Sequence, residues 1–307
     1  MGRYVIRRLL QMIPVFIGAT LLIFLMVNVM GDPIAGLCGE RKCDAATAAQ
    51  LREEFNLDKN VFVQYLLYLK DIFTGDFGTA FNGQPVTELM STAFPVTIRL
   101  TLVAIFFEII IGITLGVITG LRRGRPVDTG VLLLTLVVIS VPTFVTGLLA
   151  QLLLGVKWGW IKPSVSADAT FGELIVPGLV LASVSLAYVT RLTRTSIAEN
   201  KRSDYVRTAV AKGLPRRRVT IRHLLRNSLI PVVTFIGTDI GALMGGAIVT
   251  ERIFNIHGVG YQLYQGIVRQ NTQTVVGFVT ILVLIFMVAN LLVDLLYAVL
   301  DPRIRYA

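Results

Sequence analysis

Charged side chains are scarce in this chain of 307 residues. They make up 16% of the sequence, whereas hydrophobic residues make up 54%. Ordinary soluble domains contain about 25% charged residues, so this composition argues against a soluble globular domain and predicts a protein surrounded by lipid. The chain also lacks internal repeats, low-complexity tracts and a soluble second domain.

The sequence also lacks the usual residues of an enzyme site. A Gly-x4-Gly-Lys-Ser/Thr loop is absent, so the chain is not expected to bind ATP in the usual way. The two histidines, His223 and His257, fall on opposite sides of the membrane in the topology given below. They therefore cannot share a metal ion or activate one nucleophile. We expect no catalytic residue, metal site or cofactor in this chain.

Six apolar segments are long enough to cross a hydrocarbon core, which takes about 20 helical residues. Their hydrophobic runs are continuous, whereas the strands of a membrane barrel would alternate. The sequence therefore predicts an all-α membrane protein with six transmembrane helices. The first run is longer than the core of a typical secretory signal, so we expect it to remain uncleaved. The predicted spans are residues 9–30, 97–121, 129–156, 174–190, 231–250 and 272–293.

Basic residues predict the orientation of these spans. If the N-terminus is cytoplasmic, the cytoplasmic segments hold 19 Lys and Arg residues and the two short external loops hold 4. Because basic residues accumulate on the cytoplasmic side, both termini are predicted to be cytoplasmic. The formal charge of +10 then reflects topology and one basic loop, and we expect no nucleic-acid partner. The cytoplasmic segments are residues 1–8, 121–128, 191–230 and 301–307, and the external loops are residues 157–173 and 251–273.

Residues 31–96 are predicted to form an external segment that packs on the outer face of the helix bundle. Helical patterning is present at residues 45–55 and 61–73, and Gly75-Asp76-Phe77-Gly78 is typical of a turn. We therefore divide the chain after residue 96 into the first span with this segment and a five-helix core, residues 97–307.

Two cysteines, Cys38 and Cys43, lie in the external segment. The compartment permits oxidation, so a local disulfide is one interpretation. Two free thiols in a loop are the other, because spacing alone cannot show the geometry that a bridge needs.

The cytoplasmic loop at residues 191–230 holds eleven basic residues, yet it has helical patterning in place of the Gly, Ser and Pro of a flexible linker. One helical face is predicted to contain Tyr205, Val206, Ala209 and Val210, and the helix is predicted to end at Gly213-Leu214-Pro215. Two interpretations remain open from these residues. The loop either binds another protein or lies as a basic helix on anionic lipid.

Three carboxylates fall within or at the ends of spans: Glu108, Asp239 and Asp294. An ionisable group in hydrocarbon costs about 2.5–3.5 kcal/mol by insertion scales, so each is expected to face the bundle interior, water or a partner. Glu108 is interpreted either as a gate residue or contact to a substrate amine, or as a hydrogen-bonded structural group. Asp294 is expected to be structural.

The fifth predicted span has glycines at a spacing of four: Gly237, Gly241 and Gly245. Residues four apart share one face of a helix, so these glycines predict a ridge against which another helix can pack closely. The ridge either packs within the chain or lines a pathway at an interface between subunits.

The cytoplasmic loop resembles the signature of permease subunits of ABC importers. The matching residues are Arg207-Thr208-Ala209, Gly213, His223, Leu225 and Asn227. Two positions depart from the general signature, since Arg207 replaces an acidic residue and Arg226 replaces a proline.

Further segments narrow the resemblance to the B-type subunits of dipeptide and oligopeptide importers. Two departures affect the outer side, where His257-Gly258-Val259-Gly260 replaces the usual Pro-Gly and Arg269-Gln270 replaces the common Arg-Asp. The matching segments are Arg7-Arg8 leading into Pro14, Gly31-Asp32-Pro33, Gly75 to Gly78, Pro95-Val96-Thr97, Gly241 to Glu251, Asn290 to Tyr297 and Asp301 to Arg305.

This resemblance implies a type I ABC importer permease fold in a bacterial inner membrane. It implies a homologous second permease, two ATP-binding cassette subunits that hold ATP and Mg, an external solute-binding protein and a peptide substrate. It also implies that the cytoplasmic loop couples the chain to an ATP-binding subunit through Tyr205, Ala209, Lys212, Gly213, Leu214, Pro215 and Arg216.

Nickel or haem import by the same architecture remains an alternative. A rival of another class is an ion-coupled secondary transporter, in which Glu108 and Asp239 would be the coupling carboxylates. The cytoplasmic signature and the lack of a recognisable inverted repeat argue against that rival. An intramembrane hydrolase lacks a credible nucleophile and base.

Overall fold

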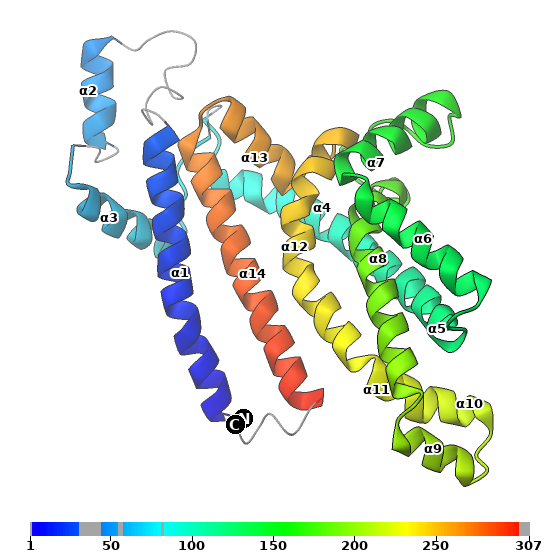
Figure 1. Ribbon diagram of the computed structural model, residues 1–307. Helices are drawn as coiled ribbons and strands as arrows, with labels where there is room; N and C mark the ends of the chain where they lie inside the picture. Colours follow the sequence, from blue (N-terminus) through cyan, green and yellow to red (C-terminus); the bar gives the residue numbers. More distant parts are fainter. Residues whose placement is uncertain (1, 31–43, 55–57, 81–82, 301–307) are drawn as a thin grey trace. The chain divides into compact units, whose positions relative to one another are not determined.

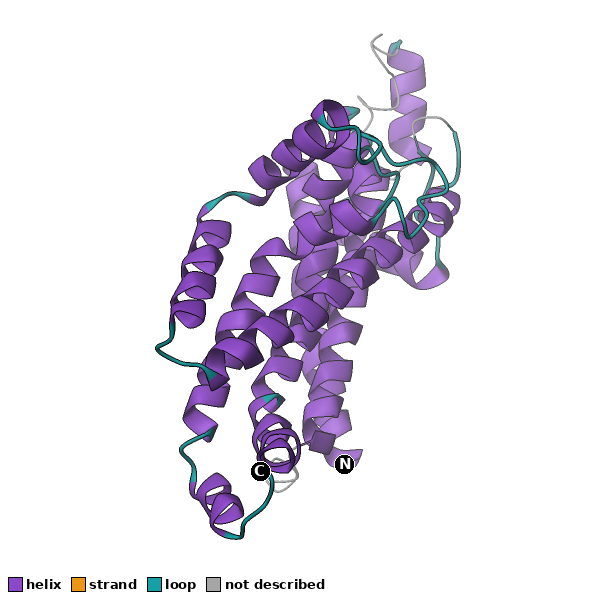
Figure 2. Ribbon diagram, turned by 90° about the vertical axis from the view of Figure 1, so that its right-hand side faces the viewer, coloured by secondary structure: helices purple, strands orange, loops and turns teal. Residues whose placement is uncertain are grey.

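The computed structural model describes residues 2–30, 44–54, 58–80 and 83–300. Within these ranges the regular secondary structure is helical, apart from one isolated bridge between Thr79 and Pro85 (Figure 2). The predicted all-α class is therefore confirmed. The candidate disulfide residues Cys38 and Cys43 lie outside the described residues.

Within the part of the chain that the structure describes, five helices are long and apolar enough to cross a membrane. A bent helix pair makes a sixth crossing if it is counted as one span. The second predicted span is one continuous helix made of α4 (Val86–Phe107), the π-helix η1 (Glu108–Ile113) and α5 (Thr114–Leu121). The other four are α1 (Gly2–Met30), α8 (Ile175–Asn200), α12 (Ile230–Phe254) and α14 (Thr272–Leu300) (Figure 1).

The third predicted span, residues 129–156, is not one straight helix. α6 (Pro126–Ser140) is followed by α7 (Thr143–Ala150) and the π-helix η2 (Gln151–Lys157), and the two parts meet at 98°. Val141, between them, has an extended backbone with φ −93° and ψ 124°. Pro142 explains this break, because proline lacks an N–H group and disfavours a helical conformation in the residue before it.

The second span begins earlier than predicted, at Val86 instead of residue 97. Val86, Met90, Ala93 and Val96 are buried at helical spacing. Packing therefore extends the helix across a stretch that is too polar to be assigned to the membrane from its composition.

The chain forms two compact units, and the first comprises Met1–Thr97 and His257–Val288. It includes α2 (Ala45–Glu54), α3 (Val61–Thr74) and α13 (Val259–Val268). The hydroxyl of Tyr65 lies 3.0 Å from Thr20 Oγ1, and that of Tyr68 lies 2.5 Å from Thr280 Oγ1. Helix α3 of the predicted external segment is therefore fixed to α1 and α14.

The second unit comprises Ile98–Ile256 and Ala289–Ala307. Its cytoplasmic-loop segment contains α9 (Asp204–Ala211), α10 (Arg216–Arg218), the π-helix η3 (Val219–Leu225) and α11 (Arg226–Ser228). Helix α8 leads into this segment and is buried along much of its length. The second unit thus contains both the predicted coupling loop and the two intramembrane carboxylates Glu108 and Asp239.

Candidate functional site

The predicted cytoplasmic loop contains an ordered helical hairpin, made of α9, α10 and η3 (residues 204–225), which follows the end of α8. Ser203 precedes α9 in an extended conformation, and its hydroxyl donates to the carbonyl of Asn200 at 2.5 Å. At the other end of α9, the Gly213 amide donates to Val210 O at 2.9 Å, and Gly213 has a φ of +72°. This left-handed conformation favours glycine because it lacks a Cβ. The expected helix end at Gly213 is confirmed.

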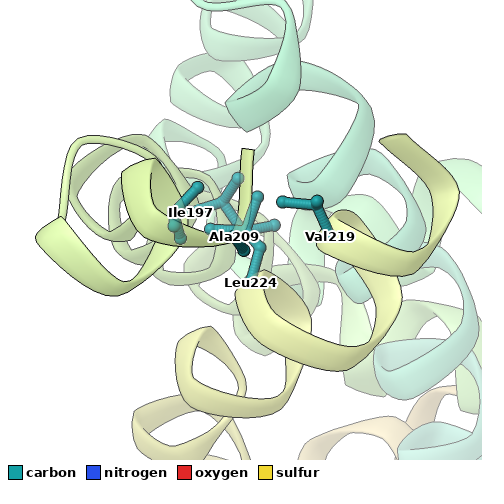
Figure 3. Close-up of a cluster of buried hydrophobic side chains, with 5 residues drawn as sticks. Ile197, Ala209, Val219 and Leu224 are labelled. Atoms are coloured by element: carbon teal, nitrogen blue, oxygen red, sulfur yellow. The ribbon is translucent and has the colours of Figure 1, made fainter. Parts of the chain in front are cut away.

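A buried apolar cluster holds this hairpin to the end of α8 (Figure 3). Leu121 at the end of α5 and the half-buried Leu214 pack against it. Burial of apolar side chains is the main force that fixes such elements to one another. The cluster consists of Ile197 from α8, Val206 and Ala209 from α9, and Val219 and Leu224 from η3.

The predicted apolar face of α9 is partly wrong. Val206 and Ala209 are buried, but Tyr205 is 37% exposed and Val210 is 61% exposed. Since α9 buries only a narrow stripe, the neighbours of Val206 and Ala209 in sequence point away from the cluster. The Tyr205 hydroxyl instead donates to Asn200 Oδ1 at 2.7 Å.

The seven predicted coupling residues therefore fall into two groups. Ala209 and Leu214 belong to the packing that supports the hairpin. The other five are exposed and available to a partner: Tyr205, Lys212, Gly213, Pro215 and Arg216.

Two hydrogen bonds add to the packing at the base of the hairpin. Ser196 Oγ on α8 donates to the carbonyl of Ser228 on α11 at 2.8 Å. Lys201 Nζ donates to the carbonyl of Leu121 at the end of α5 at 3.1 Å. These two bonds therefore hold together the ends of α5, α8 and α11 at the base of the hairpin.

A buried ion pair beside the hairpin was missed by sequence reasoning. The Arg194 guanidinium on α8 donates to Asp128 on α6 through two bonds, Nε to Oδ1 at 2.5 Å and Nη2 to Oδ2 at 2.8 Å. Asp128 Oδ2 also accepts from the Gly124 amide at 2.8 Å. The sequence places Arg194 in the loop, because its apolar pattern predicts that the fourth span ends at residue 190. Two features of the sequence could have revealed the pair: the helical pattern that continues through Arg194, and the acidic residue Asp128 in the first turn of α6.

The structure brings the intramembrane carboxylates Glu108 and Asp239 into electrostatic interaction. Glu108 is fully buried at the start of η1, and among the described residues neither of its carboxylate oxygens has a hydrogen-bond partner. Asp239 on α12 shares a side-chain hydrogen bond with Ser185 on α8. Glu108 therefore faces the interior of its own unit, as expected from the cost of exposing a carboxyl group to lipid.

The predicted glycine ridge on α12 does not form one close helix contact. A Cβ at Gly237 would lie 2.6 Å from Val293 Cγ2, whereas a Cβ at Gly245 would meet no residue of the described ranges within 4 Å. Gly241 is half-buried and Gly245 is exposed. Of these glycines, Gly237 packs within the chain and Gly245 leaves a surface without side-chain bulk.

A glycine stripe on the second span is the closer helix contact. Hypothetical Cβ atoms at Gly112, Gly116 and Gly120 would all lie within 2.9 Å of atoms of α8. The spacing of four was visible in the sequence, but sequence reasoning applied this criterion only to the fifth span.

Comparison with known proteins relates this geometry to a transport family. Residues 112–306 match the family model described as binding-protein-dependent transport system inner membrane component. Residues 1–101 match the model of the N-terminal part of such membrane components.

Curated relatives match the chain from end to end. A dipeptide transport system permease protein of Escherichia coli (strain K12) is 38% identical over 337 residues, covering 100% of this chain and 99% of the relative. An oligopeptide transport system permease protein of Bacillus subtilis (strain 168) is 35% identical over 318 residues, covering 100% of both chains. A glutathione transport system permease protein of Salmonella choleraesuis (strain SC-B67) is 35% identical over 308 residues, again covering 100% of both.

Proposed function

Because the chain belongs to the family of inner membrane components of binding-protein-dependent transport systems, we propose that it forms half of the translocation pathway of an ATP-driven importer of short peptides. It is a multi-pass protein of the bacterial inner membrane and a transport subunit. The observation that carries the peptide assignment is the end-to-end similarity to permeases for dipeptides, oligopeptides and glutathione. The subunit pairs with a homologous second permease, and an external solute-binding protein delivers the peptide.

The helical hairpin around α9 is the proposed contact to one of two ATP-binding cassette subunits, which hold ATP and Mg. Its apolar side is committed to the end of α8, while Tyr205, Lys212, Gly213, Pro215 and Arg216 are exposed. A rigid support is what this role needs, because movement of a docked subunit is then passed to α8 without being absorbed by the loop. Alternating access follows when the ATP-binding pair closes and opens.

Glu108 and Asp239 are proposed as gate residues inside this chain. Since Glu108 is fully buried, it does not meet substrate in this conformation. It lies where η1 and α12 approach α8, the helix that leads into the hairpin. A change in the packing of these helices alters the surroundings of both carboxyl groups, so their contacts favour one arrangement over another.

Purification of the chain with its natural partners, followed by reconstitution in vesicles, tests this function. Short peptides delivered by the binding protein should stimulate ATP hydrolysis, and they should enter the vesicles only when ATP is supplied on the side of the ATP-binding subunits. Nickel and haem should do neither. Uptake that follows an ion gradient without ATP would favour the secondary transporter instead. A Glu108→Gln variant in the same assay tests the gate, since normal uptake and normal ATP hydrolysis would remove Glu108 from it.

A further inference from the structure

The ion pair between Arg194 and Asp128 has no part in the proposed docking of the hairpin, yet it lies directly beside it. Arg194 is three residues before Ile197, which belongs to the buried cluster under α9. Its side chain is 17% exposed and that of Asp128 is 3% exposed. The pair therefore links α6 to the part of α8 on which the hairpin is built.

The partner helix α6 leads away from the hairpin toward the bent part of the third span. Asp128 lies in the first turn of α6, and α6 ends at the 98° bend before α7. Beyond the bend, a Cβ at Gly147 would lie 3.0 Å from Ile253 of α12, and Gln151 Nε2 donates to the carbonyl of Ile253 at 2.7 Å. A path thus runs from the hairpin through α8 to α6, and then through α7 and η2 to the far end of α12.

The geometry of the ion pair can fix the orientation of α6 relative to α8. Two parallel bonds from a planar guanidinium fix the orientation of the carboxylate as well as its distance. Asp128 is further held by the Gly124 amide, so the turn between α5 and α6 moves with it. Stability alone does not explain a buried ion pair, because replacing such a pair by apolar side chains of similar size often leaves the protein equally stable or more stable. Orientation is the property that an apolar pair would not supply.

We propose that Arg194 and Asp128 are positioning residues that make α6 follow the end of α8 when a docked ATP-binding subunit moves the hairpin. They are then needed to couple ATP hydrolysis to transport, and they are not needed for docking itself. This inference rests on the proposed function.

The test compares three variants in the reconstituted complex: Asp128→Asn, Arg194→Lys and the exchange Asp128→Arg with Arg194→Asp. The ATP-binding subunits should remain bound and hydrolyse ATP at a rate near that of the unmodified complex. Peptide uptake per ATP hydrolysed should fall about tenfold in Asp128→Asn, in the range by which single residues alter coupling. Arg194→Lys, which keeps the charge but not the two-pronged bond, should lie between, and the exchange should recover part of the coupling.

A second ion pair of the same unit provides the control. Lys162 Nζ lies 3.3 Å from Glu173 Oε1, and the Lys162 side chain is 76% exposed. The hydrogen bond from Ser166 holds the pKa of Glu173 below its usual value, so this carboxylate is charged at neutral pH. The pair lies in another loop, away from the hairpin. Glu173→Gln should leave uptake per ATP unchanged.

Failure of the inference and failure of the proposed function give different results. Normal uptake per ATP in Asp128→Asn overturns the inference. Loss of the ATP-binding subunits, or equal losses of ATP hydrolysis and uptake with no recovery in the exchange variant, also overturns it, because the pair is then only structural. If the unmodified complex neither transports peptide nor responds to it, the proposed function fails, and the variants are not needed to show this.

Discussion

Gly213 combines a positive φ with open space. Its φ is +72°, and a Cβ placed on it would meet none of the described residues within 4 Å. In Gly213→Val the β-branched side chain therefore meets backbone strain of roughly 1–3 kcal/mol, while its Cβ clashes with none of the described residues. We expect near-normal amounts in the membrane, because the apolar spans and flanking charges decide insertion. Copurification of the ATP-binding subunits, or uptake per ATP, should be lost.

Two substitutions control for this result. Gly159 also has a positive φ, +66°, and open space, but lies between η2 and α8. Gly159→Val imposes similar strain away from the hairpin and should leave copurification intact. Asparagine tolerates the left-handed region better than valine, so Gly213→Asn should retain more uptake than Gly213→Val. If the hairpin were a lipid-bound helix, normal uptake in Gly213→Val would accompany loss of uptake when Arg216, Arg217 and Arg218 are all changed to Gln.

At the scale of single residues, local backbone geometry was easier to predict than contacts between residues far apart in the sequence. The turn at Gly213 followed from the Gly-Leu-Pro sequence, and its geometry is as expected. The pairing of Arg194 with Asp128 depends on which helices meet, and the two residues are 66 positions apart. The exposure of Tyr205 and Val210 likewise depends on how narrow a stripe α9 buries, which its sequence does not reveal.

At the scale of helices, the glycine stripe on the second span makes the sharpest prediction. In Gly116→Ala the new methyl group would meet the side chain of Thr193 and lie 2.7 Å from the carbonyl oxygen of Thr190. Backbone cannot move aside cheaply, so overpacking should destabilise the protein by about 1–3 kcal/mol. The melting temperature in detergent should fall by several degrees.

Gly130 is the matched control for this substitution. It lies inside α6, and a Cβ there would have no neighbour within 4 Å among the residues that the structure describes. Alanine in an open helical position is favoured over glycine by about 0.5–1 kcal/mol, so Gly130→Ala should leave the melting temperature unchanged or raise it. Equal melting temperatures for Gly116→Ala and Gly130→Ala would show that the close approach of α5 to α8 is wrong.

The existence of the helices was largely predictable, and their irregularities were not. Five long apolar runs correspond to membrane-length helices, because a continuous hydrophobic run of that length matches the thickness of a hydrocarbon core. The π-helices η1, η2 and η3 insert extra residues into longer helices. No arrangement of Pro or Gly sets these segments apart from the rest of the helices, so the sequence does not predict them. The bend at Pro142 had a signal in the sequence, but a proline inside an apolar run is tolerated in many membrane helices.

At the scale of the whole molecule, we predict that both termini face the cytoplasm. The cytoplasmic segments then hold 19 Lys and Arg residues against 4 in the short external loops. A reporter enzyme that is active only in the cytoplasm, fused in turn to each end, should be active in both fusions. A cysteine introduced at Ser203 should resist an impermeant thiol reagent added to intact cells. Labelling of that cysteine from outside would contradict the orientation.

The bend in the third span gives the C-terminal fusion a second meaning. Helix α6 has 15 residues, about 22 Å of rise, which is less than the roughly 30 Å of a hydrocarbon core. The bent pair either completes one passage with its second half or dips in and returns to the same face. Added to the five membrane-length helices of the described residues, a passage makes six crossings, an even number, whereas a return leaves five, an odd number. The side on which the chain ends therefore depends on whether the number of crossings is even or odd. A reporter at the C-terminus thus shows whether the bent pair, far away in the sequence, crosses the membrane or returns.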